Sequence, residues 1–277
     1  MPEGDTLWRT ARTLHAALAG RSVTAFESPL VAVAAAARRQ RLVGRRVGYV
    51  ESRGKHLLIH FEGGYALHTH LGMRGSWHTY RVESPWRKPG RHPRVVLEAE
   101  DVVAVCFSPA VVEVLSAPEL HRHPALNRLG PDALSEHFDP AVARARLQER
   151  GEVEIGVALL DQTAFAGVGN VYKSEVLFLC RVNPFALVSA LGAATLESVA
   201  QTAADQLRRN LSTSTRRTTP SLTPGDLWVY NRAQKPCRRC GEPIRRAYQG
   251  EQRRSTYWCP RCQPAPMPPP PEEPVPA

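Results

Sequence analysis

The chain has 277 residues, of which 43% are hydrophobic, so it can form one large domain or two domains of ordinary size with buried cores. Its 36 basic and 26 acidic side chains give a net charge of +10, which favours a polyanionic partner such as nucleic acid or anionic lipid; a solvated positive surface without such a partner is the alternative. No window approaches the roughly 18 apolar residues that a membrane span needs, which excludes a membrane-spanning protein.

The N-terminus reads MPEGDT and leads into a pattern typical of a helix that ends at Gly20. Arg9, Arg12 and His15 interrupt this stretch, whereas a secretory signal would be continuously apolar there. We therefore expect a cytoplasmic protein whose cysteines are reduced thiols or metal ligands. The predicted apolar face of the helix consists of Leu7, Ala11, Leu14 and Leu18.

Residues 22–115 are expected to form an all-β sandwich or barrel. Short apolar stretches such as HLLIHF, YALHTHL, RVVLEAE and DVVAVCF alternate there with the turn-forming stretches SRG, EGG, KPG and AED. Residues 31–40 (VAVAAAARRQ) are predicted to be a helical or loop insert. The fold class expected for the whole chain is α+β.

A helical region follows from about residue 128. Asp139 is suited to cap a helix whose first residue is Pro140, and further helices are predicted at EVEIGVALLD, NVYKSEVLFLC and ATLESVAQTAADQLRRNL. The simplest organisation joins two domains near residues 118–130. The expected units are residues 1–120, residues 128–222, a cysteine-bearing segment at 226–263 and a disordered proline-rich tail at 264–277.

The cysteine-bearing segment contains two C-x-x-C pairs, Cys237 with Cys240 and Cys259 with Cys262. Two such pairs with a hairpin-length spacer are typical of a structural zinc site with four thiolate ligands. A redox-active or disulfide role is the alternative. Because the spacer is rich in arginine, the hairpin suits a phosphate backbone, although a ribbon that only stabilises the fold or binds a protein stays possible. The arginines are Arg245, Arg246, Arg253 and Arg254.

The stretch LLDQTAFAGVGNVYKSE predicts a helix, a turn with Gly167 and Gly169, and a second helix that starts at Asn170. The N-terminus of a helix presents backbone N–H groups that bind phosphate, and the Asn170 side chain can add a donor. Taken alone, the motif favours an ordinary capped turn. The basic composition and the zinc hairpin favour the phosphate site.

Four separated motifs now allow a comparison with a known family: PEGDT, SRGKHLLIHF, LLDQTAFAGVGNVYKSE and the C-terminal CRRC…RRSTYWCPRCQ. With them, nearly the whole chain except the tail resembles the Fpg/Nei (formamidopyrimidine-DNA glycosylase / endonuclease VIII) family of base-excision repair enzymes. The resemblance implies a catalytic N-terminal β-sandwich domain with an N-terminal helix, a helix–two-turn–helix domain and a zinc finger with one structural Zn²⁺. It also implies binding to double-stranded DNA with damaged bases or abasic sites at the bacterial nucleoid. A monomer is the default expectation for an enzyme that holds one lesion.

The resemblance gives the N-terminus a chemical role. Once Met1 is removed, Pro2 supplies a secondary amine that attacks C1′ of the damaged nucleotide, expels the base and forms an iminium with the sugar. Elimination steps then cut the strand. Glu3 matches the acid that protonates the sugar ring oxygen, Asp5 lies where some relatives carry a second acid, and Lys55 matches a lysine beside the lesion phosphate.

The same resemblance implies a set of DNA contacts. Asn170 and Arg254 match the pair that grips the phosphates around the extruded nucleotide. Met73 matches the side chain that fills the vacated space, with His70 and Leu71 beside it; a buried strand methionine is the alternative. At the second wedge, the sequence SPAVVEV replaces the arginines and phenylalanine of Fpg.

Segment STSTRRTTPSLTPGDLWVY is also shorter than the Fpg segment that caps 8-oxoguanine. These departures favour the endonuclease VIII branch and oxidised pyrimidines. The alternatives are an Fpg-type enzyme for 8-oxoguanine and formamidopyrimidines, a non-catalytic lesion-binding protein, and a zinc-ribbon protein that contacts RNA or protein.

Overall fold

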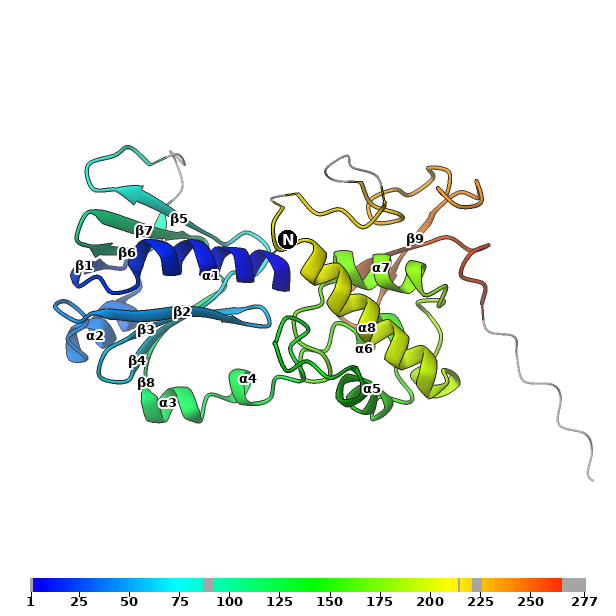
Figure 1. The fold of residues 1–277 in the computed structure, drawn as a ribbon, viewed down its shortest axis with the longest axis horizontal. Helices are drawn as coiled ribbons and strands as arrows, with labels where there is room; N and C mark the ends of the chain where they lie inside the picture. The colour runs from blue at the N-terminus through cyan, green and yellow to red at the C-terminus, as the bar shows by residue number, and fades with distance from the viewer. Residues whose placement is uncertain (1, 87–91, 214, 221–225, 266–277) are drawn as a thin grey trace, which may run out of the picture.

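The computed structural model describes residues 2–86, 92–213, 215–220 and 226–265, which form two lobes with the N-terminus between them (Figure 1). The first lobe is a sandwich of two four-stranded antiparallel sheets, ordered β1-β6-β7-β5 and β2-β3-β4-β8. The strands are β1 Val23–Glu27, β2 Val47–Arg53, β3 His56–Phe61, β4 Tyr65–His70, β5 Ser76–Arg81, β6 Pro93–Ala99, β7 Val102–Phe107 and β8 Val111–Ser116.

Helix α1 (Gly4–Leu18) lies along this sandwich and contacts β2 most extensively. Its Leu7, Leu14 and Leu18 are at most 1% exposed and join the core between the sheets, as the helical spacing predicts. Residues 31–40 contain helix α2 (Val31–Arg39), so the helical reading of this insert is confirmed. The predicted choice between sandwich and barrel is settled in favour of two separate sheets.

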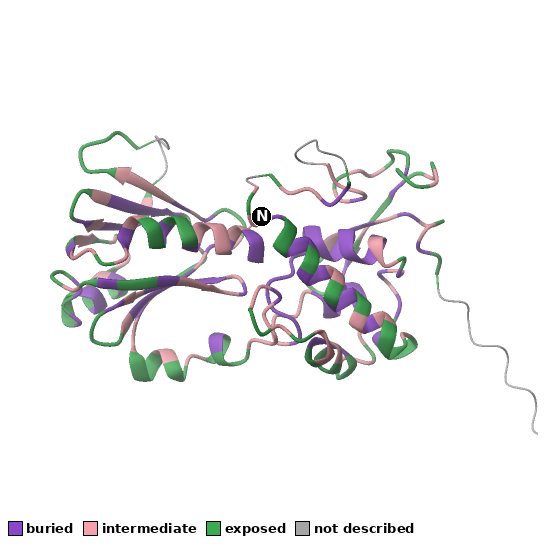
Figure 2. Ribbon diagram, in the orientation of Figure 1, coloured by how far each residue is buried: buried purple, intermediate pink, exposed green. Residues whose placement is uncertain are grey.

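Two short helices, α3 (Ala117–His121) and α4 (Pro124–Asn127), connect the sandwich to the helical lobe. Helix α7 (Asn170–Leu179) lies at the centre of that lobe and is buried along nearly its whole length (Figure 2). Among the described residues, no helix is long and apolar enough to cross a membrane. The remaining elements are α5 Pro140–Gln148, α6 Ile155–Ala158, α7 Asn170–Leu179, the 3₁₀ helix η1 Val188–Ala190, α8 Ala193–Arg209 and the hairpin strands β9 Arg245–Gln249 and β10 Arg254–Trp258.

The helix predictions in this lobe are confirmed with one correction. The Asp139 side chain accepts a hydrogen bond from Ala141 N at 2.8 Å, as predicted for the cap of α5. By contrast, the helix predicted at residues 152–161 is only α6. It ends early because the Asp161 carboxylate binds Thr163 N at 2.8 Å and Arg150 Nε at 3.1 Å, which forms a turn. From residue 266 onward, the predicted disordered tail lies outside the described residues.

Candidate active site between the lobes

The first residues of the chain dock onto the loop that precedes α7. Gly4 N donates a hydrogen bond to Gly167 O at 2.9 Å. A Cβ atom at Gly4 would lie 3.1 Å from Gly167 Cα, and Gly167 itself has a φ of +97°, so the approach of the two backbones depends on both glycines. Pro2 is therefore held, half-buried, at the junction of the lobes (Figure 1).

Glu3 binds the N-terminus of α7 with its side chain. One carboxylate oxygen accepts from Val171 N at 2.8 Å, and the other accepts from Gly169 N at 2.9 Å and Tyr172 N at 3.3 Å. Glu3 is fully buried, so these donors and the helix dipole replace the water that the carboxylate has lost. The expectation that these amides are open to a phosphate is therefore wrong, because the protein's own carboxylate occupies them.

Lys55 reaches the same junction from the turn between β2 and β3. Gly54 has a φ of +57°, and its N–H donates to Asp132 Oδ2 at 2.6 Å, which docks this turn against the helical lobe. Burial, and then the positive charges of Arg254 and Arg216, lower the pKa of Lys55 to about 8, while Glu3 acts in the opposite direction. Lys55 thus lies within electrostatic range of the Glu3 site and is only partly protonated near pH 8.

Asp5 forms a buried ion pair that the sequence did not indicate. Its side chain is fully buried and receives Arg216 Nε at 2.9 Å and Arg216 Nη2 at 2.7 Å, with Arg9 Nη1 at 3.1 Å. Arg216 Nη2 also donates to Thr6 Oγ1 at 2.8 Å. This pair fastens the segment after α8 to the first turn of α1. Arg216 was missed because it lies in a stretch without periodicity.

Asn170 fastens the cysteine hairpin to α7. Its Nδ2 donates to Ser255 O at 2.8 Å and to Ser255 Oγ at 3.1 Å. One turn later, Lys173 Nζ donates to Thr256 Oγ1 at 2.7 Å, and burial followed by the charge of Arg254 lowers the pKa of Lys173 to about 7. These bonds fix β10, and with it Arg254, beside the N-terminus of α7.

Met73 and Arg254, predicted from distant parts of the chain, lie together. Met73 is 67% exposed, and its Sδ lies 3.8 Å from Arg254 Nη1, so the alternative of a buried strand methionine is wrong. His70 ends β4 half-buried, with its ring 4.9 Å from that of His56. Leu71, however, is 2% exposed and belongs to the sandwich core, so the prediction of a DNA contact for Leu71 is corrected.

A third buried carboxylate, that of Glu175 on α7, was also missed. It accepts from the backbone N–H groups of Trp228 at 2.7 Å, Val229 at 2.9 Å and Tyr230 at 2.7 Å, and from the hydroxyl of Thr218. An acid inside the apolar run of α7 was the available signal in the sequence. Glu175 therefore holds the start of the cysteine module against the helical lobe.

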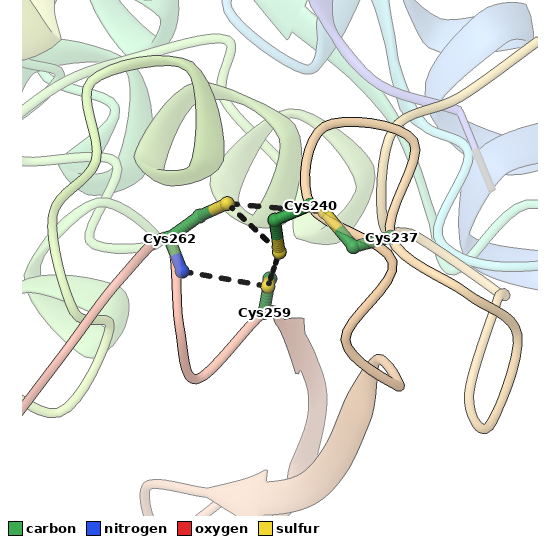
Figure 3. A group of neighbouring side chains, drawn as sticks. All are labelled: Cys237, Cys240, Cys259 and Cys262. Atoms are coloured by element: carbon green, nitrogen blue, oxygen red, sulfur yellow. Dashed lines mark hydrogen bonds between the residues drawn. The ribbon is translucent and has the colours of Figure 1, made fainter.

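The four predicted cysteine ligands converge at the end of the hairpin (Figure 3). The Sγ–Sγ distances are 3.5 Å for Cys240–Cys259 and for Cys240–Cys262, and 3.9 Å for Cys237–Cys262. A tetrahedral zinc ion with Zn–S bonds of about 2.3 Å sets its sulfurs about 3.8 Å apart. The cluster therefore has the spacing of a metal site, and no disulfide joins its free thiols.

Comparisons with known proteins bear on this site. Residues 1–110 match the formamidopyrimidine-DNA glycosylase N-terminal domain, and residues 129–220 match its H2TH domain. The chain is 43% identical over 275 residues to a probable endonuclease 8 2 of Streptomyces coelicolor, covering 98% of this chain and 96% of that protein. It is 41% identical over 266 residues to the DNA-(apurinic or apyrimidinic site) lyase Nei2 of Mycolicibacterium smegmatis, covering 96% and 100%.

A solved structure shares the fold. The formamidopyrimidine-DNA glycosylase of Lactococcus lactis, bound to DNA with an abasic site, superposes with a TM-score of 0.81 at 23% identity, over 95% of this chain and 100% of that one.

Proposed function

The chain belongs to the Fpg/Nei family, in its endonuclease VIII branch, and on that premise we propose that it is a DNA glycosylase and AP lyase of base excision repair. It removes oxidised bases, with pyrimidines preferred, from double-stranded DNA and then cuts the strand at the resulting abasic site. We further propose that it acts as a monomer in the cytoplasm, where the bacterial chromosome lies.

The observation that carries this proposal is the position of Pro2 and Glu3. The chain's first residues are fixed between the lobes by Gly4, and Lys55 approaches the same point. After removal of Met1, an α-amino group such as that of Pro2 has a pKa of roughly 7.7–8.0, so a minor fraction of it is unprotonated at neutral pH and can act as a nucleophile. The Pro2 amine at this junction would face DNA that binds between the lobes.

The reaction follows from that amine. Its lone pair attacks C1′ of the damaged nucleotide, the bond to the base breaks, and an iminium with the opened sugar forms. The iminium accepts the electrons released when a proton leaves C2′, and the 3′-phosphate departs; a second elimination releases the 5′-phosphate. We assign Glu3 to protonation of the sugar ring oxygen and Lys55 to the phosphate beside the lesion.

Binding is assigned to residues from both lobes at the junction. We assign Arg254 and Asn170 to the phosphates next to the extruded nucleotide, and the exposed Met73 to the space that the nucleotide leaves. Asn170 is 5% exposed and donates its Nδ2 to Ser255, so it must exchange that bond for a phosphate when DNA binds. His70 lies at the edge of this surface. Base extrusion costs a few kcal/mol, which damaged pairs reduce. The 3.8 Å contact between Met73 Sδ and Arg254 Nη1 supports the proposal that the wedge and the phosphate contact act on the same nucleotide.

Zinc completes the assignment. We propose that Cys237, Cys240, Cys259 and Cys262 bind one structural Zn²⁺, whose role is to hold the hairpin that carries Arg254. With four protein ligands, the ion has no position left for a water or a substrate, so it takes no part in the chemistry.

The preference for pyrimidines is supported by the segment that would cap an extruded purine. Residues 216–219 are fastened by Asp5 and by Glu175, instead of forming a long glycine-rich loop. The alternative is an Fpg-type enzyme for 8-oxoguanine and formamidopyrimidines. Cutting of duplexes with thymine glycol and with 8-oxoguanine, side by side, decides between the two.

Borohydride trapping on a duplex with one abasic site tests the chemistry. We expect a covalent adduct with the native protein and none when the N-terminus is blocked. Lys55 is the rival amine because its pKa is about 8, so Lys55→Met with a free terminus is the matched control and retains the adduct. An adduct that survives blocking but not Lys55→Met would move the nucleophile to Lys55. Absence of any adduct from zinc-loaded protein that binds DNA would leave a non-catalytic lesion-binding protein.

A further inference from the structure

A group of histidines and one glutamate lies on the face of the β2-β3-β4-β8 sheet that points away from the sandwich core. His68 on β4 and Glu113 on β8 are direct partners in the antiparallel ladder, and His123 is the N-cap residue of α4. His68 Nδ1 lies 2.8 Å, and His123 Nε2 3.0 Å, from the same oxygen of Glu113. We propose that these three side chains bind a second metal, a divalent first-row transition ion such as Zn²⁺.

The donor set fits such an ion. Two imidazoles and one carboxylate, with a remaining position for water, are ligands that zinc takes in proteins. The three ligand atoms lie within 4.8 Å of one another. The Glu113 side chain is 40% exposed, whereas those of His68 and His123 are 1% and 13% exposed, so the site opens to solvent on one side only.

The protein positions these ligands before any metal arrives. The strand ladder fixes His68 against Glu113, and the capping box between Ser116 and Glu119 fixes the turn that follows β8. Leu126 of α4 then packs with Leu58 and Ala66 on the same face of the sheet. Because the backbone is already ordered, binding orders few additional groups.

The hydrogen bonds around the histidines suit a ligand role for His68. Its second ring nitrogen, Nε2, lies 2.8 Å from His56 Nδ1. Nδ1 now donates its proton to Glu113; when His68 binds the ion through Nδ1, the ring proton is on Nε2 instead, and the hydrogen bond with His56 Nδ1 reverses so that His68 donates it. A metal-bound histidine is usually oriented by such a partner.

His123 must change tautomer to bind. Its Nδ1 accepts a long hydrogen bond of 3.3 Å from Leu126 N, so its ring proton is on Nε2 and faces Glu113. Metal binding moves that proton to Nδ1 and gives up this one weak bond. The ion also sets each ring nitrogen about 3.3 Å from the carboxylate oxygen, so the present 2.8 and 3.0 Å widen by a few tenths of an ångström. The half-exposed Glu113 side chain allows this shift.

The site would join the sheet of the first lobe to α4, which leads into the second lobe. It uses none of the residues assigned to DNA or to the cysteine cluster. If the metal proposal failed, the proposed repair activity would therefore be unaffected.

Metal stoichiometry in the full-length protein with a zinc-loaded cysteine cluster tests the proposal. We expect equilibrium dialysis against Zn²⁺ to give two ions per chain for the native protein, and one for Glu113→Gln and for His123→Gln. His121→Gln is the matched control, because His121 lies exposed on the same connector, and it should retain two. Co²⁺ added to this protein should give ligand-field absorption but no thiolate charge-transfer bands. Glu113→Gln should abolish that ligand-field absorption.

Two results would overturn the proposal. A single ion per native chain would mean that His68, Glu113 and His123 only form hydrogen bonds with one another. A second ion that persists in Glu113→Gln would place the metal elsewhere.

Discussion

The Glu3 carboxylate accepts a hydrogen bond of 2.8 Å from the backbone N–H of Val171, a residue 168 positions further along the chain. This single bond joins the N-terminus of the protein to the first turn of the central helix of the other lobe. It therefore couples the position of the proposed nucleophile, Pro2, to the packing between the lobes. Disturbing Glu3 should affect both stability and chemistry.

We expect Glu3→Gln to unfold more easily by about 1–3 kcal/mol, because the neutral amide keeps one acceptor oxygen and turns an N–H group toward buried donors. Glu3→Gln should also lose the ability to excise an oxidised base. Denaturant unfolding and single-turnover excision measure the two effects. Glu149→Gln, at an exposed glutamate, is the control. Unchanged stability of Glu3→Gln would contradict the buried contact.

Replacement of Arg216 by Ala should destabilise the protein by about 3 kcal/mol, because it leaves the buried Asp5 carboxylate with Arg9 as its remaining charged partner. Asp5→Asn in the same chain should recover much of that loss, since the uncompensated charge disappears. A double-mutant cycle by urea unfolding measures the coupling. Additive effects of the two substitutions would show that the ion pair contributes little.

DNA affinity should fall as the pH rises through about 8. Below this pH, Lys55 is charged and attracts phosphate; above it, the free protein must take up a proton to regain that attraction. Lys55→Gln should bind more weakly at pH 7 and lose the step near pH 8. Equilibrium binding at constant ionic strength from pH 6.5 to 9.5 tests this. A step near pH 8 that survives in Lys55→Gln belongs to another group, first of all the Pro2 amine, whose ordinary pKa is roughly 7.7–8.0.

Local patterns explain which features the sequence could predict. Helix α1 and the cysteine cluster follow from spacing alone, because a helical face and a pair of C-x-x-C motifs are encoded within a few residues. The pairing of Asp5 with Arg216 and of Glu3 with α7 joins residues far apart in the chain. Such contacts depend on how the lobes pack, and no periodicity records them.

The same limit explains the wedge. Met73 and Leu71 are two residues apart in one turn, and the sequence offered both as DNA contacts. The turn sends Leu71 into the core and Met73 into solvent. Only the path of the backbone decides between them, because both side chains are apolar.

Loss of zinc should weaken DNA binding before it unfolds the sandwich. The β9–β10 hairpin has two strands, and an isolated hairpin of this size is marginally stable in water. Cys240→Ser should therefore release the hairpin and Arg254 with it, and lower DNA affinity by at least about tenfold, the loss of roughly 1.4 kcal/mol of phosphate contacts. Cys180→Ser, outside the cluster, is the control. Zinc content and DNA binding, measured on the same samples, check this.

Met73→Ala and Leu71→Ala should separate a DNA contact from a core contact within one turn. Because Met73 is 67% exposed, its truncation should leave the unfolding free energy within about 0.5 kcal/mol of the native value. It should slow excision from duplex DNA more than incision of a single strand with an abasic site, since only the duplex must be held open. Leu71→Ala should instead cost about 2–5 kcal/mol of stability through the cavity that it leaves. If Met73→Ala slowed the reaction equally on both substrates, Met73 would not be the wedge residue. The space left by the extruded nucleotide would then have to be filled by residues on the β8 side of the junction.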